Sequence, residues 1–360
     1  MIVSEFIPKP YKSFLESGSV AYSSPSNIAL VKYWGKKANQ IPANPSISFT
    51  LNNCKTLTTL KFEKKTTKGF SFEVFLDGII QNEFKPKIKQ FFERIEVYLP
   101  FLTSYHFKIE TSNTFPHSSG IASSASGMSA LALCLVQLEQ RLNLEMTKGF
   151  FNKKASFLAR LGSGSACRSI EGTLIVWGSH TNIIGSSDLV GIKYPYKVHP
   201  CFNNFCDTIL LVDKGEKQVS STVGHDLMYR HPFAEQRFAQ AHTNMDALIE
   251  VFKTGNLSAF ISIVEREALT LHAMMMSSDP YFMLMKPNTL EIINKIWVFR
   301  KKTGLHICFT LDAGANVHVL FPENEANEIR EFIKTILVMH CQNEQFIEDI
   351  LGEGAQSIKI

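Results

Sequence analysis

The sequence predicts an α+β protein built in two parts. Short runs of β-branched and aromatic residues, separated by turn residues, dominate the first half of the chain. Long apolar patterns with helical spacing dominate the second half. Between them, residues 180–205 carry Gly, Pro and Ser and no clear period. Because strands and helices are segregated along the chain, we expect a domain boundary in that stretch, which divides residues 1–195 from 196–360.

The first half is expected to form a sheet with a few helices packed on it. The strand-like runs lie at residues 27–34, 46–52, 57–63, 71–77, 104–111 and 172–178. A helix at 86–99 interrupts them, because Ile88, Phe91, Phe92, Ile95 and Tyr98 fall on one helical face. A long helix is expected to start after the Ser- and Gly-rich stretch at 117–127 and to continue to about Leu142, and a further helix to cover 147–161.

The second half is expected to be mainly helical. A strand at 207–213 precedes helical patterns, which lie at 233–253, 257–275, 288–302 and 323–340. Two strands, at 305–311 and 316–321, separate the last two helices.

The composition excludes several classes of protein. The net charge of the 360 residues is only +4, whereas a nucleic-acid-binding protein usually carries a more basic, clustered face. No apolar run approaches the roughly 18 residues of a membrane helix, and the N-terminus lacks the apolar core of a signal peptide. The seven cysteines form no CxxC pair. We therefore expect a cytoplasmic protein with reduced thiols and with no nucleic-acid or membrane partner.

The segment PHSSGIASSASG, Pro116–Gly127, is the first that indicates chemistry. Its small residues let the backbone approach a ligand, and the helix that follows directs free N–H groups and its positive dipole end at that ligand. No Lys follows the glycine, so it is not the GxxxxGK[ST] phosphate loop. Taken alone, the segment equally fits a small-residue helix start packed on a sheet.

A second Gly- and Ser-rich segment is GSGSACRS, Gly162–Ser169. Its N–H groups form an anion cup, and Arg168 can bind a carboxylate or phosphate through two parallel hydrogen bonds. The alternative is a turn with a surface Arg. Two such segments in one chain indicate a substrate with more than one anionic group.

Two further segments carry charged side chains next to strands. NIALVKYWGKK, Asn27–Lys37, ends a strand pattern at Gly35 and places three Lys within six positions. FTLDAGANVHVLF, Phe309–Phe321, places Asp312 between an apolar strand and a turn. An edge strand with solvated Lys and a turn-capping Asp are the alternatives.

Together these four segments resemble the diphosphomevalonate decarboxylase family. FPHSSGIASSASG is similar to the phosphate loop of the GHMP kinase superfamily, and KYWGK, SGSACR and DAG-x-N in combination are specific to the decarboxylase branch. PANPSISFTL at 42–51, VSSTVGHDL at 219–227 and the Leu271–His272 pair also have counterparts. The resemblance implies a GHMP-kinase fold, in which a ribosomal S5-like N-terminal domain precedes a C-terminal α/β-sandwich domain.

The resemblance also implies an activity, cofactors and partners. The expected reaction is the ATP- and Mg²⁺-dependent decarboxylation of (R)-5-diphosphomevalonate to isopentenyl diphosphate, with release of ADP, phosphate and CO₂, in the mevalonate pathway. The expected assembly is a homodimer.

The resemblance assigns roles by position. Asp312 is expected to be the catalytic base, Lys32 to face the reacting centre, and Arg168 to bind the substrate carboxylate while Asn27 holds it. The remaining substrate contacts are expected from Tyr33, Lys36, Ser163, Gly164, Ser165, Ser221 and Thr222. The ATP phosphates are expected at Ser118, Ser119, Gly120, Ser123 and Ser124, with Ser124 also a magnesium ligand.

The chain departs from the family pattern at several positions. Ile79 and Thr222 stand where relatives have Arg, and His117 and Ser119 stand where Thr and Ala are usual. The missing Arg side chains keep alternatives open: a decarboxylase of the monophosphate, a kinase of the 3-hydroxyl group without loss of CO₂, or a nucleotide-binding pseudoenzyme.

Overall fold

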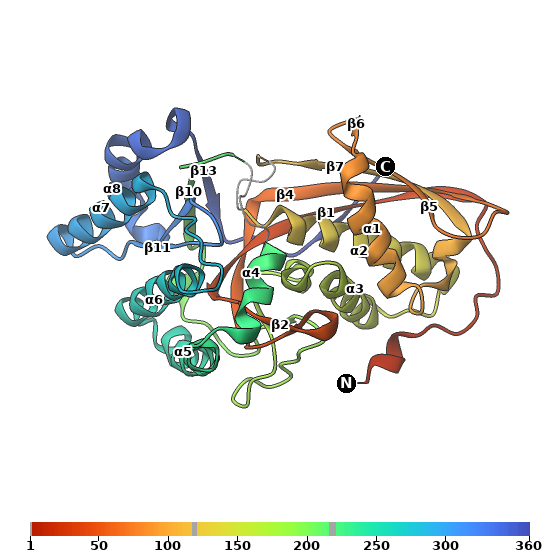
Figure 1. Ribbon diagram of the computed structural model, residues 1–360, viewed down its shortest axis with the longest axis horizontal. Helices are drawn as coiled ribbons and strands as arrows, with labels where there is room; N and C mark the ends of the chain where they lie inside the picture. The colour runs from red at the N-terminus through yellow and green to blue at the C-terminus, as the bar shows by residue number, and fades with distance from the viewer. Residues whose placement is uncertain (1, 117–120, 216–220) are drawn as a thin grey trace.

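A computed structural model describes residues 2–116, 121–215 and 221–360, without the side chains of Ser221 and Thr222. The protein has two parts that lie side by side (Figure 1). The N-terminal part is built on a large sheet, and the C-terminal part combines a smaller sheet with long helices. The α+β prediction is confirmed, while the boundary near residue 195 stays a prediction.

The larger sheet has eight strands among the described residues, in the order β14-β1-β4-β7-β5-β6, with β8 on β4 and β9 on β8. Their bounds are β1 Ser17–Val31, β4 Ser46–Lys64, β5 Ser71–Leu76, β6 Ile79–Ile80, β7 Tyr105–Asn113, β8 Leu174–Trp177, β9 Ile192–Lys193 and β14 Gln356–Ile358. The strands predicted at 46–52 and 57–63 are a single strand, β4, which continues across an irregularity in the ladder with β1 at residues 51–54. A short hairpin of β2, Lys36–Lys37, and β3, Ile41–Pro42, follows β1.

Three helices cover one face of this sheet: α1 Lys85–Ile95, α2 Ser123–Leu142 and α3 Lys148–Gly162 (Figure 1). A core rich in Phe and Leu fills the space between them and the sheet. The prediction that α2 starts after residue 127 is wrong, since the helix begins at Ser123, directly after Ala122 in a left-handed conformation with φ 45°. Ser123, Ser124 and Ser126 therefore lie in the first turn of α2.

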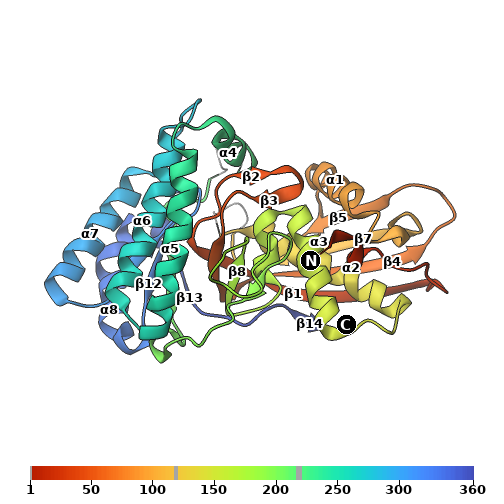
Figure 2. The same ribbon diagram turned by 90° about the horizontal axis from the view of Figure 1, so that it is seen from below.

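The smaller sheet has the order β11-β12-β10-β13. Its strands are β10 Cys206–Leu210, β11 Cys308–Thr310, β12 Val317–Phe321 and β13 Phe346–Ile350. The accompanying helices are α4 Ser221–Leu227, α5 Ala234–Thr254, α6 Leu257–Met276, α7 Pro287–Thr303 and α8 Ala326–Phe332, and α5, α6 and α7 run side by side (Figure 2). The helix predicted over 323–340 is only in part an α-helix, because π and 3-10 turns replace it over 333–340 while keeping apolar residues on the core side.

The chain returns to the first sheet at its C-terminal end. After β13 pairs with β10 in the smaller sheet, β14 pairs with β1 at the edge of the larger one. A core of residues from both parts lies between the two sheets and the helices α5 and α6. The sequence did not predict β13 and β14, which join the two parts. The end of β1 and the turn after β11 consequently face one another at this junction.

Candidate active site

A cavity of about 620 Å³ lies where the two parts meet. Residues from β1 to β3, α2, the loop after α3, α4, α6 and the turn after β11 all contribute to its wall. Ten of the sequence-predicted residues line it: Lys32, Tyr33, Lys36, Ser123, Ser124, Ser163, Gly164, Ser165, Arg168 and Asp312. The fold thus gathers into one cavity side chains that are up to 280 positions apart in the sequence.

Lys32 and Asp312 form an ion pair in the wall of the cavity. The Lys32 Nζ donates to Asp312 Oδ1 at 3.1 Å, and their side chains are 2% and 29% exposed. Burial lowers the pKa of Lys32, while the neighbouring Asp312 carboxylate opposes that shift. Lys32 is therefore not the solvated lysine of an edge strand. Its ammonium reaches the cavity from a buried stem.

The turn that carries Asp312 is fixed by its own backbone. The Gly314 N–H donates to the Asp312 carbonyl at 2.7 Å, which closes a tight turn. His272 of α6 lies 3.2 Å from the same carbonyl through Nε2. Burial lowers the pKa of His272 to about 4, so the ring is neutral and its Nε2–H is the donor. With its backbone held in this way, the Asp312 carboxylate points to Lys32 and the cavity.

Arg168 is buried, not a surface residue of a turn. It lies near the end of the 3-10 helix Gly164–Ser169 and is 4% exposed. Its Nε donates to Asn27 Oδ1 at 3.2 Å, and its Nη1 donates to Ser46 Oγ at 2.5 Å. Asn27 does not line the cavity, but its Nδ2 donates to Ser169 Oγ at 2.8 Å, which fixes its orientation. These partners are neutral, and no ion pair of Arg168 occurs among the described residues. The guanidinium is thus held in place with its charge directed to the cavity.

The Gly- and Ser-rich turn before Arg168 packs closely against aromatic rings. A Cβ on Gly164 would lie 2.8 Å from the Trp177 ring and 2.9 Å from the Tyr33 hydroxyl. The Tyr33 ring also contacts Trp177, with centroids 4.6 Å apart. Glycine is required here because the Tyr33 hydroxyl occupies the space that a side chain would need. Tyr33 and residues 163–165 therefore form one continuous polar wall.

The N-terminal end of α2 meets this wall. Ser124, in the first turn, lies 3.3 Å from Ser163, oxygen to oxygen. The two anion-binding segments that the sequence predicts separately are thus neighbours in space. Ser118, Ser119 and Gly120, the other residues predicted to bind the ATP phosphates, lie outside the described residues.

The helix α4 packs against the turn after β1, between the two parts of the molecule (Figure 1). The Gly35 N–H donates to His225 Nδ1 at 3.0 Å, and Lys36 Nζ lies 3.5 Å from Asp226 Oδ1. Burial lowers the pKa of His225 to about 3, so that the ring is a neutral acceptor. Ser221 and Thr222 begin this helix, and their side chains are not described. The helix α4 was not predicted, because seven residues are too few to show a helical period.

Sequence reasoning missed the other end of the cavity. Its wall comes from β4, β5, β7, α1 and α2, and is lined by Thr56, Thr58, Val74, Leu76, Phe84, Lys87, Ile88, Ile109, Thr111, Asn113, Met128 and Leu131. A weak signal was present in the alternation of Thr56 and Thr58 along one strand. Nothing in the sequence distinguished these residues from ordinary strand residues that face a core.

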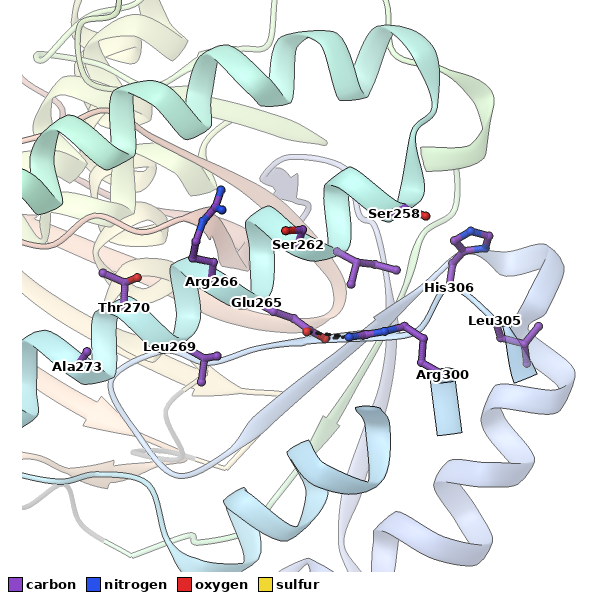
Figure 3. Close-up of a pocket in the computed structure, with 12 residues that line it drawn as sticks. Ser258, Ser262, Glu265, Arg266, Leu269, Thr270, Ala273, Arg300, Leu305 and His306 are labelled. Atoms are coloured by element: carbon purple, nitrogen blue, oxygen red, sulfur yellow. Dashed lines mark hydrogen bonds and ion pairs between the residues drawn. The ribbon is translucent and has the colours of Figure 1, made fainter. Parts of the chain in front are cut away.

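A second hollow, of about 670 Å³, lies on the outer side of the C-terminal part, between α6 and the end of α7. Figure 3 shows the Glu265–Arg300 ion pair that crosses it, whose closest atoms are 2.6 Å apart. None of the sequence-predicted site residues lines this hollow. Volume alone therefore does not locate the active site. The convergence of buried charged groups does.

Two family models match most of the chain. Residues 24–189 match the diphosphomevalonate decarboxylase-like N-terminal domain, and residues 208–358 match the mevalonate 5-diphosphate decarboxylase C-terminal domain. The chain belongs to the diphosphomevalonate decarboxylase family. The resemblance drawn from the four sequence segments is confirmed, and these segments lie around the cavity.

Named relatives support the same family. The chain is 29% identical to the diphosphomevalonate decarboxylase of Ganoderma lucidum over 94% of its length and 86% of that protein, and 25% identical to that of Homo sapiens over 88% and 80%. A solved structure described as "MDDEF in complex with MVAPP, AMPPCP and Magnesium" superposes with a TM-score of 0.82 at 29% identity, covering 96% of this chain and all of that one. The mevalonate diphosphate decarboxylase of Staphylococcus aureus superposes with a TM-score of 0.81 at 26% identity, covering 95% and 98%. The predicted GHMP-kinase fold is confirmed by these structures.

Proposed function

We propose that this protein is a diphosphomevalonate decarboxylase, which converts (R)-5-diphosphomevalonate and ATP to isopentenyl diphosphate, ADP, phosphate and CO₂. The observation that carries the proposal is that a Lys32–Asp312 pair and the buried Arg168 guanidinium line the same cavity as the first turn of a long helix. The relatives named as diphosphomevalonate decarboxylases, and the family structure with MVAPP and AMPPCP, support the same reaction.

The chemistry requires activation of the tertiary hydroxyl group. A β-hydroxy acid has no carbonyl group to accept the electrons that decarboxylation releases, so the hydroxyl must become a leaving group. Transfer of the ATP γ-phosphoryl group to the hydroxyl oxygen achieves this. The bond to the carboxylate carbon then breaks, its electron pair forms the carbon–carbon double bond, and phosphate leaves with the C–O electron pair. No electron-accepting cofactor is needed.

The side chains fit these steps. The Asp312 carboxylate accepts the hydrogen bond of the substrate hydroxyl and takes its proton as the phosphoryl group is transferred. The Lys32 ammonium balances the charge that develops beside it. Arg168 orients the substrate carboxylate, while Tyr33, Lys36 and residues 163–165 hold the diphosphate. Phosphoryl transfer depends mainly on such positioning and charge stabilisation.

The residues at the start of α2 fit ATP phosphates and a magnesium ion. The free N–H groups and the positive dipole end of this 20-residue helix favour anions. Ser124 is exposed in the first turn and offers a hydroxyl oxygen, the type of ligand that Mg²⁺ accepts. No cluster of three or more acidic, His or Cys side chains suited to a metal occurs in the described part of the chain. Mg²⁺ would therefore be held mainly by the phosphates and water, and would supply neutralisation of the triphosphate charge.

The test is a turnover assay with purified protein. We expect ADP and CO₂ in equal amounts when mevalonate diphosphate, ATP and Mg²⁺ are all present. CO₂ release without ATP would contradict the mechanism, and ADP release without CO₂ would instead show a kinase of the 3-hydroxyl group. Nucleotide binding with neither product would indicate a pseudoenzyme.

One observation favours the monophosphate as a second candidate substrate. Ile79, which stands where relatives carry Arg, is 66% exposed in β6 and does not line the cavity.

We expect Lys36 to supply the contact to the terminal phosphate that this Arg would make. A charged contact of this kind contributes about 1.5–3 kcal/mol, so Lys36→Ala should reduce the preference for diphosphate over monophosphate by about ten- to a hundredfold in kcat/KM. Equal slowing with both substrates would exclude Lys36, and a parent enzyme without any preference would favour the monophosphate function.

We further propose a cytoplasmic homodimer. All seven cysteines are free thiols, which supports a reducing compartment. In the described ranges, none of the helices has the length and apolar character that crossing a bilayer requires. Light scattering during size-exclusion chromatography would distinguish a dimer from a monomer.

A further inference from the structure

The backbone of Lys32 is held from the C-terminal part of the molecule. The Lys32 N–H donates to Glu267 Oε2 of α6 at 2.9 Å. The Lys32 carbonyl accepts from Arg237 Nη2 of α5 at 3.0 Å and from Asn44 Nδ2 at 3.0 Å. Lys32 follows β1 directly, so these bonds replace the ladder at the point where the strand ends. The position of the Lys32 side chain is thereby set by residues more than 200 positions away.

The two charged partners form a buried pair of their own. Arg237 Nη2 donates to Glu267 Oε2 at 2.5 Å and Arg237 Nη1 donates to Glu267 Oε1 at 3.2 Å, and both side chains are 0% exposed. Asn244 Nδ2 donates to Glu267 Oε1 at 2.5 Å. The orientation of that amide is fixed, because Asn244 Oδ1 accepts from Arg266 at 2.9 Å. In Figure 3, Arg266 points away from Glu265, on the side of α6 that faces α5.

A fully buried ion pair is by itself weak evidence for a role in stability. Removing two charges from water costs as much free energy as their attraction returns, and apolar residues of similar size often serve equally well. What apolar residues could not do here is hydrogen-bond both the N–H and the carbonyl of Lys32. The planar guanidinium of Arg237 donates hydrogen bonds to both the Glu267 carboxylate and the Lys32 carbonyl.

We infer that Arg237 and Glu267 are positioning residues, which hold Lys32 so that its ammonium meets Asp312 and the reacting centre. Neither residue lines the cavity, and they act through Lys32. The same helix that carries Glu267 also carries His272, whose ring binds the Asp312 carbonyl. One rigid helix, α6, therefore sets the backbone on both sides of the Lys32–Asp312 pair. This inference rests on the proposed function, since it assigns a catalytic role to Lys32.

The charges around Lys32 give the inference a specific readout. The charges of Asp312, Glu267 and Arg168 act on the pKa of Lys32. The charge of Lys32 in turn acts on the pKa of His272 and of Asp207. Arg237 contacts the Lys32 carbonyl. The negative charge of Glu267 raises the pKa of Lys32. Its removal lowers that pKa, and the uncompensated charge of Arg237 acts in the same direction. Removal of Arg237 leaves the Glu267 charge uncompensated, and this raises the pKa of Lys32.

The experiment compares Glu267→Gln and Arg237→Gln with the parent enzyme. We expect each to lower kcat by about ten- to a hundredfold, with little change in KM for either substrate, because a small misplacement of a catalytic group carries such a penalty. The high-pH limb of the kcat profile, where Lys32 loses its proton, should move to lower pH in Glu267→Gln and to higher pH in Arg237→Gln. A merely structural role would not move the limb in opposite directions.

Two further variants control for folding. The double variant Arg237→Gln/Glu267→Gln removes both buried charges, so it keeps the fold when a single variant does not. It should have a low kcat and the parent's high-pH limb. Glu139→Gln breaks a similarly buried pair, Glu139–Lys154, whose side chains are 1% exposed and which lies in the N-terminal part. It should lower Tm but keep the parent's kcat and pH profile.

A measurement without turnover separates this inference from the proposed function. NMR titration of ε-¹³C-labelled lysine, with the Lys32 signal identified by its loss in Lys32→Arg, follows the ammonium directly. Opposite displacements of its pKa in the two single variants, with lowered kcat, support the inference. Folded variants with the parent's kcat and the parent's Lys32 titration overturn it. A parent enzyme that releases no CO₂ overturns the proposed function, and the titration then still decides whether the pair is coupled to Lys32.

Discussion

At the scale of single residues, burial gives the site its chemical character. Lys32, Arg168 and His272 are all buried, and burial lowers the pKa of each. At Lys32 the adjacent Asp312 carboxylate opposes this lowering of the pKa, because it stabilises the ammonium form. At His272 burial outweighs the influence of Asp312 and lowers the pKa to about 4, so the ring is neutral and donates a hydrogen bond to the Asp312 carbonyl. The same physical effect thus produces two different roles, which the neighbours decide.

Asp312→Asn is the sharpest test at this scale. The substitution keeps the size of the side chain and removes its charge, so the group can no longer take the hydroxyl proton. We expect kcat to fall on the order of 10³-fold or more, with substrate binding largely kept, because the carboxylate acts mainly in the transition state. Steady-state kinetics and calorimetric titration of the substrate measure the two effects. A variant with near-normal kcat would show that Asp312 is only a turn residue.

At the scale of elements, the site depends on how two short segments end. The 3-10 helix after α3 turns the chain so that Gly164 faces Tyr33 and Trp177, while Arg168 is buried four residues later. The first turn of α2 approaches the same segment through Ser124 and Ser163. The two segments therefore supply neighbouring parts of one cavity wall.

Gly164→Ala tests this contact. The added methyl group would lie 2.8 Å from the Trp177 ring and 2.9 Å from the Tyr33 hydroxyl. Overpacking of this kind costs about 1–3 kcal/mol. Displacement of Tyr33 should therefore raise KM for mevalonate diphosphate on the order of tenfold or more, with a smaller effect on KM for ATP. Gly149→Ala in α3 is the matched control, because its Cβ meets nothing within 4 Å. Equal KM values in the two variants would contradict the proposed substrate wall.

At the scale of the whole molecule, the two parts are joined by more than the chain between them. Asp349 of β13 accepts hydrogen bonds from the N–H groups of Asn52, Asn53 and Cys54 in β4, each at 2.8 Å. Its side chain belongs to the smaller sheet, and its partners belong to the larger one. This carboxylate therefore holds the two sheets together on the side of the molecule where β13 leads into β14.

Asp349→Asn should weaken that connection. An amide cannot accept on both sides, so its NH₂ group would face a backbone N–H, and at least one buried donor would lose its partner. We expect a loss of about 1–3 kcal/mol in the free energy of unfolding, measured by urea denaturation. The neighbouring Glu348→Gln removes an exposed pair with Lys334 and should cost less than about 1 kcal/mol. Equal stability of the two variants would show that Asp349 does not join the sheets.

The sequence by itself determined the α+β class, most of the longer elements and the four segments around the cavity. These depend on local causes: apolar period, turn residues, and Gly or Ser beside a helix start. Residues 46–64 were divided wrongly into two strands, because the polar residues near Asn52 and Asn53 resemble a turn, and the distant Asp349 carboxylate that accepts their N–H groups leaves no local pattern. The strand β14 escaped prediction because a short edge strand has no period of its own and is defined by its pairing with β1.

Only the tertiary structure decided which charges are buried and which partners they meet. Apart from the family resemblance, nothing in the local pattern distinguishes the buried Lys32, which pairs with Asp312, from Lys37, an exposed lysine of the same segment. Nor could the sequence connect Arg237 and Glu267 with Lys32, because hydrogen bonds from two helices to one peptide unit leave no pattern along the chain. Burial and long-range hydrogen bonding depend on the packing of distant segments, whereas local propensity reports only on neighbours in sequence. The motifs thus locate the site, and the packing of α5 and α6 against the end of β1 sets its geometry.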